Sequence, residues 1–528
     1  MDSRHDAYLP GAGLVIFLMA AILLLPWLGE TLFNSKGEPR EAIVAVSMIQ
    51  QGDWILPHNF GTDIPYKPPF MAWIIATFAV IFNGGHVTEF LSRLPSALAA
   101  LAMIMGSFYW ARQVRGTRFA MIFSLVLLTC IEVFRAAVAC RLDMILMACM
   151  TGAIYMLYNL MEHQGRLRPL RYAAVITLLS CATLTKGPIG SLLPCLAMGI
   201  YGLLRGRRFF PTLFKMLAIA IASMIVPALW YYAAYLRGGE GFYDLMMEEN
   251  IGRLTGKMSY ESHVNPFWYN FVTIILGLLP WTVLLIAALP SAGRLRNIRL
   301  TPAGKLALTV AATVIIFYCI PASKRSVYLL PAYPFLCYGI TSLLCEDSSA
   351  KITRFFTWMM AIIAILAPTA AVAIQFYPMN LLPMEPLEWW QYIMVALPVI
   401  FGFAWFINRH SPVGHLLLTV WGLYLAYASA IMPAVLNTKS DTKIVPELMK
   451  APAVLCTEKF RPYTVNFYLD NKVTPIKSFG EIAAYPKGTV ILTDINPETI
   501  EIPDGFDTKL LKKRSCDHRT PMFAIIKQ

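Results

Sequence analysis

Two glutamates open the first polar interval of a strongly apolar chain. Glu38 precedes Pro39, and proline is favoured in the first turn of a helix, so the spacing predicts a short amphipathic helix over residues 39–51 that lies on the membrane surface. Glu38 and Glu41 are three residues apart and therefore project from one side of that helix. Such a pair is typical of a helix start, where carboxylates complement the helix dipole. A carboxylate in this position also suits a base that orients or deprotonates an acceptor hydroxyl.

Other charged residues stand at the ends of apolar runs. Lys67 comes just before two prolines in "YKPPF", and Lys186 lies in the short turn of "LTKGPIG". A lysine in such a place reaches toward lipid headgroups or holds a phosphate beside a helix start. Asp143, in "CRLDMIL", begins an apolar run. It is either a helix N-cap or a functional group, because acidic side chains at membrane depth are rare.

The segments that must position these residues are long and apolar. Hydrophobic residues make up 57% of the 528 residues and charged residues only 14%, against about a quarter in soluble proteins. We therefore predict an all-α polytopic membrane protein. Its thirteen expected spans are 10–29, 88–111, 118–134, 143–161, 171–185, 189–204, 213–233, 268–290, 304–320, 327–345, 355–376, 390–408 and 413–433.

Charge predicts the orientation of these spans. If the ambiguous apolar run 68–84 lies at the interface, alternate loops and the N-terminus hold 18 Lys and Arg against 5 Asp and Glu, the whole net charge of +13. The positive-inside rule then places the N-terminus in the cytoplasm and the C-terminus outside. The positive charge is thereby explained by membrane topology, and no nucleic-acid partner is expected.

The outer segments that follow from this topology are a first periplasmic loop over 30–87, then 135–142, the Lys186 turn, 234–267, 321–326, 377–389 and a tail from about residue 434. We predict a membrane domain over 1–433 and a small α/β domain over 434–528, in which "APAVLC", "VNFYLD", "KVTPIK", "GTVILTDI" and "MFAIIK" are short β-rich runs and "FGEIAAY" is helical. Cys456 and Cys516 lie in this tail, and the sequence leaves open whether they pair.

Cations on the outer side run against the usual trend, because outer loops of bacterial membrane proteins are poor in Lys and Arg. They are Lys67, Arg141, Lys186, Arg253, Lys324 and Arg325. Their natural ligand is the phosphate of an anionic lipid. Together with the carboxylates they suit a transferase in which cations neutralise a leaving phosphate. A carboxylate then acts as a base, or only as a positioning group if the acceptor is itself a phosphate.

These residues resemble the GT-C superfamily of polyprenyl-phosphate-sugar glycosyltransferases. The resemblance is greatest to the lipid A aminoarabinose transferases, and the protein O-mannosyltransferases are more distant cousins. It rests on the order of "GE" (Gly37-Glu38, for an acidic "DE" motif), "GDW" (52–54), "YKP" (66–68, for "EKP"), Asp143, "LTKG" (184–187), "RL…H…PFWY" (Arg253, His263, 266–269), "LPW" (279–281) and "LLPAYP". Gly37 and Tyr66 depart from the acidic residues of the family pattern.

The resemblance implies inverting sugar transfer from undecaprenyl phosphate at the periplasmic surface of a bacterial inner membrane. It makes Glu38 and Asp143 the central carboxylates, with Glu41 in support. Donor-phosphate ligands are then Lys67, Lys186, Arg253, Tyr269 and Lys324. A divalent metal ion is left open, and His263 is its one candidate ligand, although a lone histidine is more often structural.

The expected partners are an undecaprenyl-phosphate-linked sugar, lipid A or another envelope glycolipid or glycan, and membrane lipids, with the protein acting as a monomer. One alternative is a protein O-glycosyltransferase. A transporter would place charged or Gly/Pro-broken segments at span centres and show repeats, which the sequence does not have. A lipid-binding scaffold without catalysis would leave Glu38 dispensable.

Overall fold

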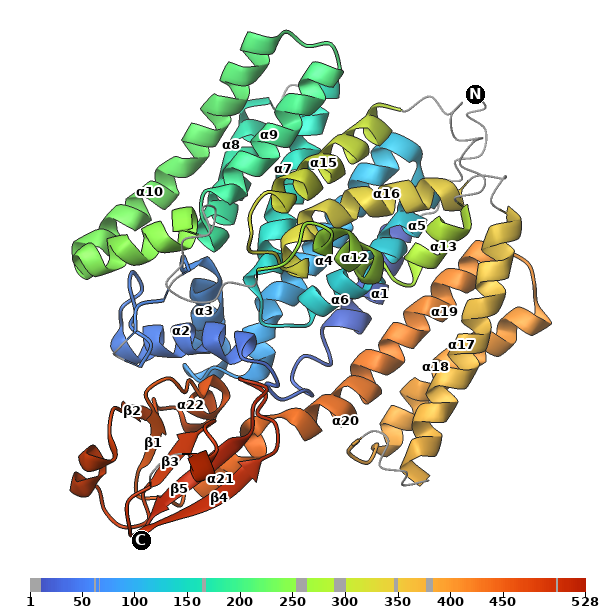
Figure 1. The fold of residues 1–528 in the computed structure, drawn as a ribbon. Helices are drawn as coiled ribbons and strands as arrows, with labels where there is room; N and C mark the ends of the chain where they lie inside the picture. The colour runs from blue at the N-terminus through green and yellow to red at the C-terminus, as the bar shows by residue number, and fades with distance from the viewer. Residues whose placement is uncertain are drawn as a thin grey trace.

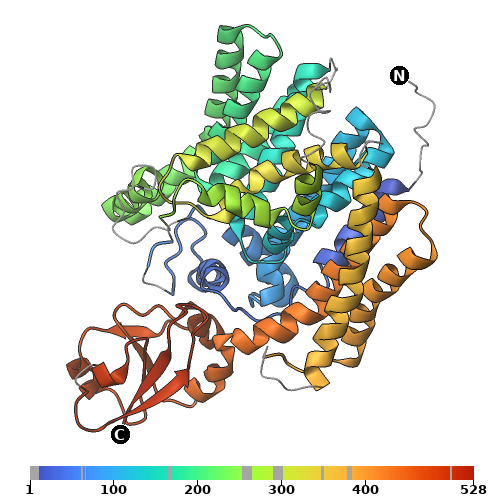
Figure 2. The ribbon, with the colours of Figure 1, turned by 45° about the vertical axis from the view of Figure 1, so that its right-hand side comes forward.

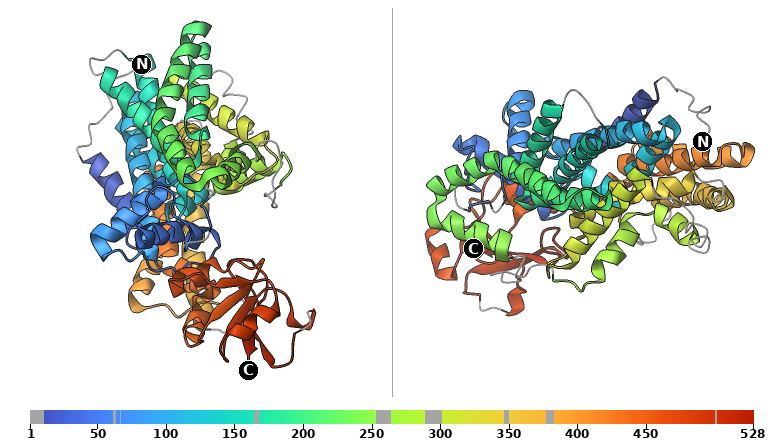
Figure 3. Two further views of the ribbon diagram at one scale, coloured as in Figure 1. Left: turned by 90° about the vertical axis from the view of Figure 1, so that its left-hand side faces the viewer. Right: turned by 90° about the horizontal axis from the view of Figure 1, so that it is seen from above.

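The computed structural model describes residues 11–528 apart from 61–62, 66, 164–167, 253–263, 289–300, 346–349, 377–382 and 500–501. The chain forms a large helical part with a small sheet domain protruding from one end, as Figures 1 and 3 show. The two predicted types of structure, a polytopic helical body and a C-terminal α/β domain, are thus confirmed.

The first half of the helical part runs from the N-terminus to a long kinked helix. Its helices are α1 (Ala12–Leu24), α2 (Gly37–Gln51), α3 (Phe70–Asn83), α4 (Glu89–Arg115), α5 (Thr117–Leu128), α6 (Ile131–Ala137), α7 (Leu142–Glu162), α8 (Arg168–Lys186), α9 (Ile189–Leu204) and α10 (Phe209–Met247), followed by the π-helical turn η1 (Glu248–Gly252). The predicted surface helix over 39–51 is α2, which begins two residues earlier than expected.

The second half continues to the start of the sheet domain. It contains α12 (Tyr269–Gly277), α13 (Trp281–Ala288), α15 (Pro302–Cys319), the 3-10 segment η3 (Ser326–Ala332), α16 (Tyr333–Leu344), α17 (Ala350–Phe376), α18 (Trp389–Ile407), α19 (Pro412–Ala426), the π-helical turn η5 (Tyr427–Ile431) and α20 (Met432–Leu436). In Figures 1 and 2, α17, α18 and α19 form a bundle at the side of the molecule, and α19 and α20 lead toward the sheet domain.

Each predicted span falls on a helix or on a bent pair of helices. In the described part of the chain, eight helices are long and apolar enough to cross a membrane, and ten spans result if the pairs α5–α6 and α12–α13 each count as one. The remaining predicted spans correspond to α1, α8 and α9, of which α1 and α9 are shorter apolar helices. The number thirteen therefore stays a prediction. The ambiguous run 68–84 forms the 14-residue helix α3.

The C-terminal domain contains one five-stranded sheet with the order β2-β1-β3-β5-β4. β1 pairs in parallel with β2 and β3, and β5 pairs antiparallel with β3 and β4. The strands are β1 (Val454–Thr457), β2 (Thr474–Ile476), β3 (Val490–Thr493), β4 (Phe506–Lys512) and β5 (Met522–Lys527).

Two local predictions for this domain need correction. "VNFYLD" is not a strand but most of helix α22 (Tyr463–Leu469), because its apolar residues pack both under the sheet and against α2. β4 was not expected, since most of its side chains are exposed and its sequence has no apolar alternation. "FGEIAAY" is helical as predicted and forms the 3-10 helix η8 (Phe479–Ala484). All ten cysteines are free thiols, so Cys456 and Cys516 are not bonded.

Helix α22 holds the sheet domain against the loop between α1 and α2. The rings of Phe33 and Phe467 meet edge to face with centroids 4.8 Å apart. The Tyr468 hydroxyl accepts a hydrogen bond from the Phe33 backbone N–H at 3.1 Å and donates one to Glu89 Oε1 at 2.5 Å. Figure 1 shows α22 directly beneath α2, and the domain is thus in contact with the helix that carries both predicted glutamates.

Candidate functional site

An ion pair joins the ends of two membrane helices. Asp143 lies in the first turn of α7, Lys186 is the last residue of α8, and Lys186 Nζ donates a hydrogen bond to Asp143 Oδ1. The same Nζ lies 4.1 Å from the centre of the Tyr328 ring. Gly187 turns the chain after Lys186 with φ +87°, and a Cβ there would come within 2.7 Å of Asn250 Oδ1. The turn therefore requires glycine and fixes the position of the lysine.

A small cavity of about 50 Å³ surrounds this pair. We call it the cationic cavity, and its lining residues are Gly37, Arg40, Glu41, Lys67, Cys140, Arg141, Leu142, Asp143, Lys186, Arg325 and Tyr328. They include five cations and two carboxylates, an excess of three positive charges. Such an excess in a partly buried site favours an anionic group with several oxygens, such as a phosphate.

Some of these cations already have carboxylate partners. Lys67, which lies in the loop before α3, is 2.9 Å from Glu249 Oε2, and Arg40 is 2.9 Å from Glu41 Oε1. The guanidinium groups of Arg141 and Arg325 have no ion-pair partner within the described ranges. Burial lowers the pKa of Arg141, an effect that the charges of Asp143 and Glu38 partly oppose. A bound anion would compensate this buried charge.

Gly37 lies beside the Arg141 guanidinium. A Cβ built on Gly37 would lie 3.9 Å from Arg141 Nη2, its nearest neighbour. An acidic side chain here, as the resemblance leads us to expect, would begin close to the guanidinium. With glycine at this position, the cationic cavity has one carboxylate fewer than expected.

Glu38 is enclosed in a different set of contacts. It is only 5% exposed, and Arg93 donates to Oε1 from Nε at 2.8 Å and to Oε2 from Nη2 at 3.2 Å. The backbone N–H of Cys140 also donates to Oε1, at 2.9 Å. Burial alone would raise the pKa of Glu38, but the charge and hydrogen bonds of Arg93 lower it below its ordinary value. Both carboxylate oxygens thus accept hydrogen bonds. These bonds connect α2 to α4 and to the loop before α7.

A larger apolar cavity of about 820 Å³ adjoins the cationic cavity through Arg141, which lines both. Its walls come mainly from α6, α13, α17 and α19, with Phe134, Val283, Met360 and Leu423 among the lining residues. Glu38, Arg93, Arg135, Arg141 and Arg519 add polar groups. We call it the apolar cavity. Such a combination of apolar walls and a few polar groups suits an amphiphilic ligand.

Two other predicted donor ligands, Lys324 and Tyr269, do not line these two cavities. Lys324 is buried, and its Nζ donates to the carbonyl oxygens of Pro321 at 2.7 Å and Asn265 at 3.1 Å. The lysine thus links the loop after α15 to the segment before α12. Tyr269 begins α12 and lines neither cavity. Arg253 and His263 lie outside the described residues.

Sequence reasoning missed Arg40 and Arg93. Arg93 lies in the second turn of the membrane helix α4 and is 2% exposed. Its presence in an otherwise apolar span was a usable signal, because charged residues at membrane depth are usually paired or functional. Arg40 lies within the stretch "GEPRE", but it carried no distinct signal of its own.

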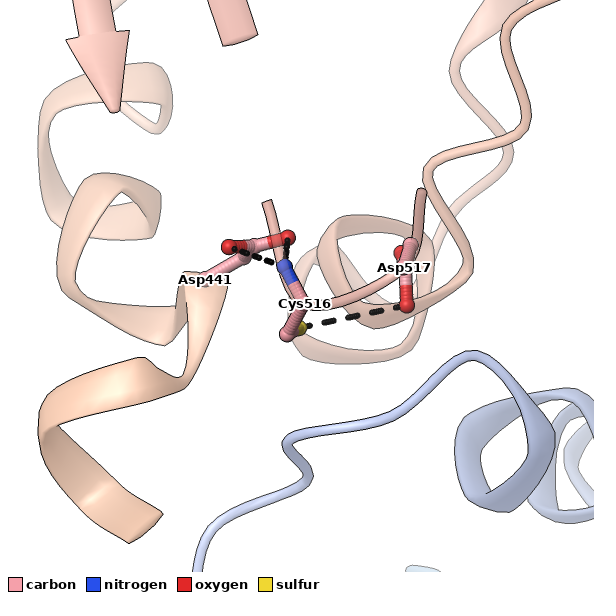
Figure 4. A group of neighbouring side chains, drawn as sticks. All are labelled: Asp441, Cys516 and Asp517. Carbon is pink, nitrogen blue, oxygen red and sulfur yellow. Dashed lines mark hydrogen bonds between the residues drawn. The ribbon is translucent and has the colours of Figure 1, made fainter. Parts of the chain in front are cut away.

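One group in the sheet domain has metal-like spacing. Within the described ranges, Asp441, Cys516 and Asp517 place potential ligand atoms within 4.8 Å of one another (Figure 4). However, Asp441 Oδ1 already accepts from Lys512 Nζ at 2.8 Å, and its Oδ2 accepts from the Ser515 hydroxyl at 2.6 Å. The lysine supplies the positive charge that a metal ion would otherwise bring. We therefore interpret the cluster as a structural hydrogen-bond network.

Comparison with known proteins agrees with the fold. The family described as dolichyl-phosphate-mannose-protein mannosyltransferase matches residues 66–232. An undecaprenyl phosphate-alpha-4-amino-4-deoxy-L-arabinose arabinosyl transferase of Proteus mirabilis is 27% identical over 460 residues, which is 83% of this chain and 79% of the relative.

Among solved structures, ArnT from Cupriavidus metallidurans bound to undecaprenyl phosphate superposes with a TM-score of 0.75 at 20% identity and covers 98% of both chains. The archaeal oligosaccharyltransferase AglB from Archaeoglobus fulgidus superposes with a TM-score of 0.51 at 12% identity, over 91% of this chain and 69% of its own. The fold expected from the sequence motifs is thus confirmed from end to end.

Proposed function

We propose that this chain, a multi-pass membrane glycosyltransferase of the GT-C type close to the lipid A aminoarabinose transferases, transfers a sugar from an undecaprenyl-phosphate donor to lipid A. The observation that carries the proposal is the cationic cavity, in which charged side chains from distant parts of the chain meet beside a larger apolar cavity. A polyprenyl phosphate has the matching chemistry, an anionic head on a long apolar chain.

The reaction breaks the bond between the sugar C1 and the phosphate oxygen of the donor. An oxygen of the acceptor forms the new bond to C1, with inversion, and the undecaprenyl phosphate leaves with one additional negative charge. The excess of cations stabilises this developing charge more strongly than the charge of the bound donor. Lys67, Lys186, Arg141 and Arg325 lie in the cavity where that phosphate would be held.

Asp143 is the carboxylate best positioned to act near the reacting atoms, since it lines the cationic cavity. Its ion pair with Lys186 keeps the carboxylate charged and directs it. An acceptor hydroxyl would need it as a base, whereas an acceptor phosphate is already an anion and needs only positioning. Glu38 acts as a positioning residue in this proposal, because Arg93 and Cys140 occupy its oxygens. Glu41, paired with Arg40 at the cavity wall, supports the geometry of that wall.

The proposal places the site and the sheet domain at the periplasmic face of a bacterial inner membrane. The distribution of Lys and Arg among the loops supports this orientation. Labelling of single cysteines, introduced into the sheet domain of a cysteine-free variant, by a membrane-impermeant maleimide would test it. Labelling only after the inner membrane is opened would contradict the orientation.

The direct test is transfer by the purified chain in detergent from an undecaprenyl-phosphate sugar to lipid A, followed by mass spectrometry of the lipid product. We expect Asp143→Asn to abolish product while the protein still inserts and purifies normally. Glu162→Gln is the matched control, because Glu162 pairs with Arg205 at the other end of the same helix. Near-normal product from Asp143→Asn would contradict the assignment.

A protein acceptor is the second candidate, and the match of residues 66–232 to the protein mannosyltransferase family favours it. The two functions differ in where the sugar appears. Mass spectrometry of envelope lipids and of secreted proteins, with and without the gene, separates them. Sugar on serine or threonine of a secreted protein, with unchanged lipid A, would replace the lipid acceptor with a protein.

A further inference from the structure

A third cavity lies at the opposite end of the α17–α19 bundle from the sheet domain. It has a volume of about 410 Å³ and is formed by the first turns of α17 and the end of α18. Its lining residues are Ala350, Lys351, Arg354, Phe355, Trp358, Trp405 and Arg409. α19 begins near this end and runs through α20 toward the sheet domain, so the elements that form this cavity lie at the end of the bundle away from that domain (Figure 1). We call it the α17–α18 basic pocket.

Three cations line this pocket without any carboxylate. Lys351 and Arg354 are three residues apart on α17 and therefore share one face, and Arg409 follows the end of α18. All three are exposed, and in the part of the chain that the structure describes none of them forms an ion pair or a side-chain hydrogen bond. No acidic side chain of the described residues lines the pocket. Among the described residues, three neighbouring positive charges therefore face one space and no carboxylate faces it.

Aromatic side chains give the same pocket an apolar wall. Phe355 is 61% exposed and Trp358 47% exposed, whereas Trp405 is buried between the helices. Tryptophan is enriched where a membrane helix crosses from the hydrocarbon region into the headgroup region. α17 has apolar residues exposed along its length, for example Leu366 and Phe376, so its outer face is directed to lipid. Cations beside aromatic rings at such a boundary match a phosphate head with an acyl chain attached.

We propose that the α17–α18 basic pocket binds an anionic phospholipid of the leaflet opposite to the reaction site. Lys351, Arg354 and Arg409 contact the headgroup phosphate, and Phe355 and Trp358 contact the glycerol and the first acyl carbons. A free phosphate ion would use the cations but not the exposed aromatic wall, and the lipid is therefore the occupant that the whole pocket fits.

The bound lipid would also influence the apolar cavity. Trp358 is followed on α17 by Met359 and Met360, which line that cavity. The first turns of α17 thus belong to the pocket, and the next turn belongs to the apolar cavity wall. A lipid that holds α17 against α18 restricts the position of this wall.

The experiment measures lipid binding to the full-length, delipidated protein in detergent by native mass spectrometry. Cardiolipin, phosphatidylglycerol and zwitterionic phosphatidylcholine are added at equal concentrations. We expect adducts with the two anionic lipids at concentrations where phosphatidylcholine gives none. Each cation contributes about a fivefold gain in affinity, so the triple variant Lys351→Gln/Arg354→Gln/Arg409→Gln should bind the anionic lipids on the order of 100-fold more weakly.

A matched control separates this site from general charge. The control variant Arg118→Gln/Arg168→Gln/Arg208→Gln removes three exposed cations at the starts of other helices. The sequence predicts these cations on the same side of the membrane as the pocket. This control should bind anionic lipid as the unmodified protein does. Equal loss in both triple variants, no loss in the pocket variant, or adducts with phosphatidylcholine as strong as with cardiolipin would each overturn the proposal. Displacement of the lipid by an equal concentration of inorganic phosphate would also overturn it, because the site would then be one for a free anion.

Discussion

Removing Arg93 alone should destabilise the protein more than removing both members of its pair with Glu38. Arg93→Met keeps an unbranched side chain of similar length but leaves the Glu38 carboxylate buried. Among the described residues, only the Cys140 N–H then still donates to it. Breaking one partner of a buried ion pair costs about 3–5 kcal/mol, whereas replacing both is often neutral. The double variant Glu38→Gln/Arg93→Met should therefore recover most of the stability that Arg93→Met loses.

The pH dependence gives this prediction a second measurement. In the unmodified protein the pKa of Glu38 is below its ordinary value of 4.5, so the pair contributes stability above that value and loses it as pH falls through the folded pKa. Without Arg93, burial raises the pKa of Glu38 instead. Arg93→Met should therefore become more stable as pH falls from 8 to 5.5, and the double variant should not.

Thermal unfolding in detergent at pH 8 and pH 5.5 measures both effects. The control is Arg205→Met, whose partner Glu162 lies at a less buried position, with side-chain exposures of 32% and 14% for the two residues. That pair should contribute only about 0–1 kcal/mol. Equal melting of the single and double Arg93 variants at both pH values would refute the view that Glu38 is a buried positioning carboxylate.

Four further outcomes follow from the site and the sheet domain. Lys67→Ala should weaken donor binding, measured as apparent affinity for an undecaprenyl-phosphate sugar, and an unchanged affinity would exclude Lys67 from the phosphate site. Gly37→Asp should place a carboxylate near Arg141, whose Nη2 is 3.9 Å from the added Cβ, and weaken donor binding as well; tighter binding would contradict this. Burial raises the pKa of Asp517 to about 7, so the charged carboxylate lowers the free energy of unfolding progressively as pH rises from about 4 to 7. Asp517→Asn should therefore raise the melting temperature at pH 8 and flatten its pH dependence. A lower melting temperature of this variant at pH 8 would contradict the prediction. A chelator should leave the melting temperature unchanged, because Lys512 neutralises Asp441. A lower melting temperature with the chelator would indicate a bound metal ion at Asp441, Cys516 and Asp517.

The sequence predicted the helical body and the surface helix α2 well, because both follow from apolar length and the position of Pro39. It also predicted that Asp143, Lys186 and Lys67 would gather, since all stand at span ends on one side. It did not predict that Glu38 would be closed by Arg93, because the two are 55 residues apart and their contact depends on how α2 crosses α4. Lys324 has the positive charge expected of a phosphate ligand, and the sequence predicted it on the same side as the other cations. Its contacts with backbone carbonyls depend on the local loop conformation, which a charge pattern does not predict.

The position of α22 beneath α2 has a consequence for truncation of the chain. α22 supplies Phe467 and Tyr468, and these residues pack on the same loop and helix whose other side forms part of the cationic cavity. A protein cut before residue 441 would expose an apolar surface to solvent and release the helix that bears Gly37, Arg40 and Glu41. The sheet domain therefore supports the wall of the cationic cavity, and its loss should abolish transfer.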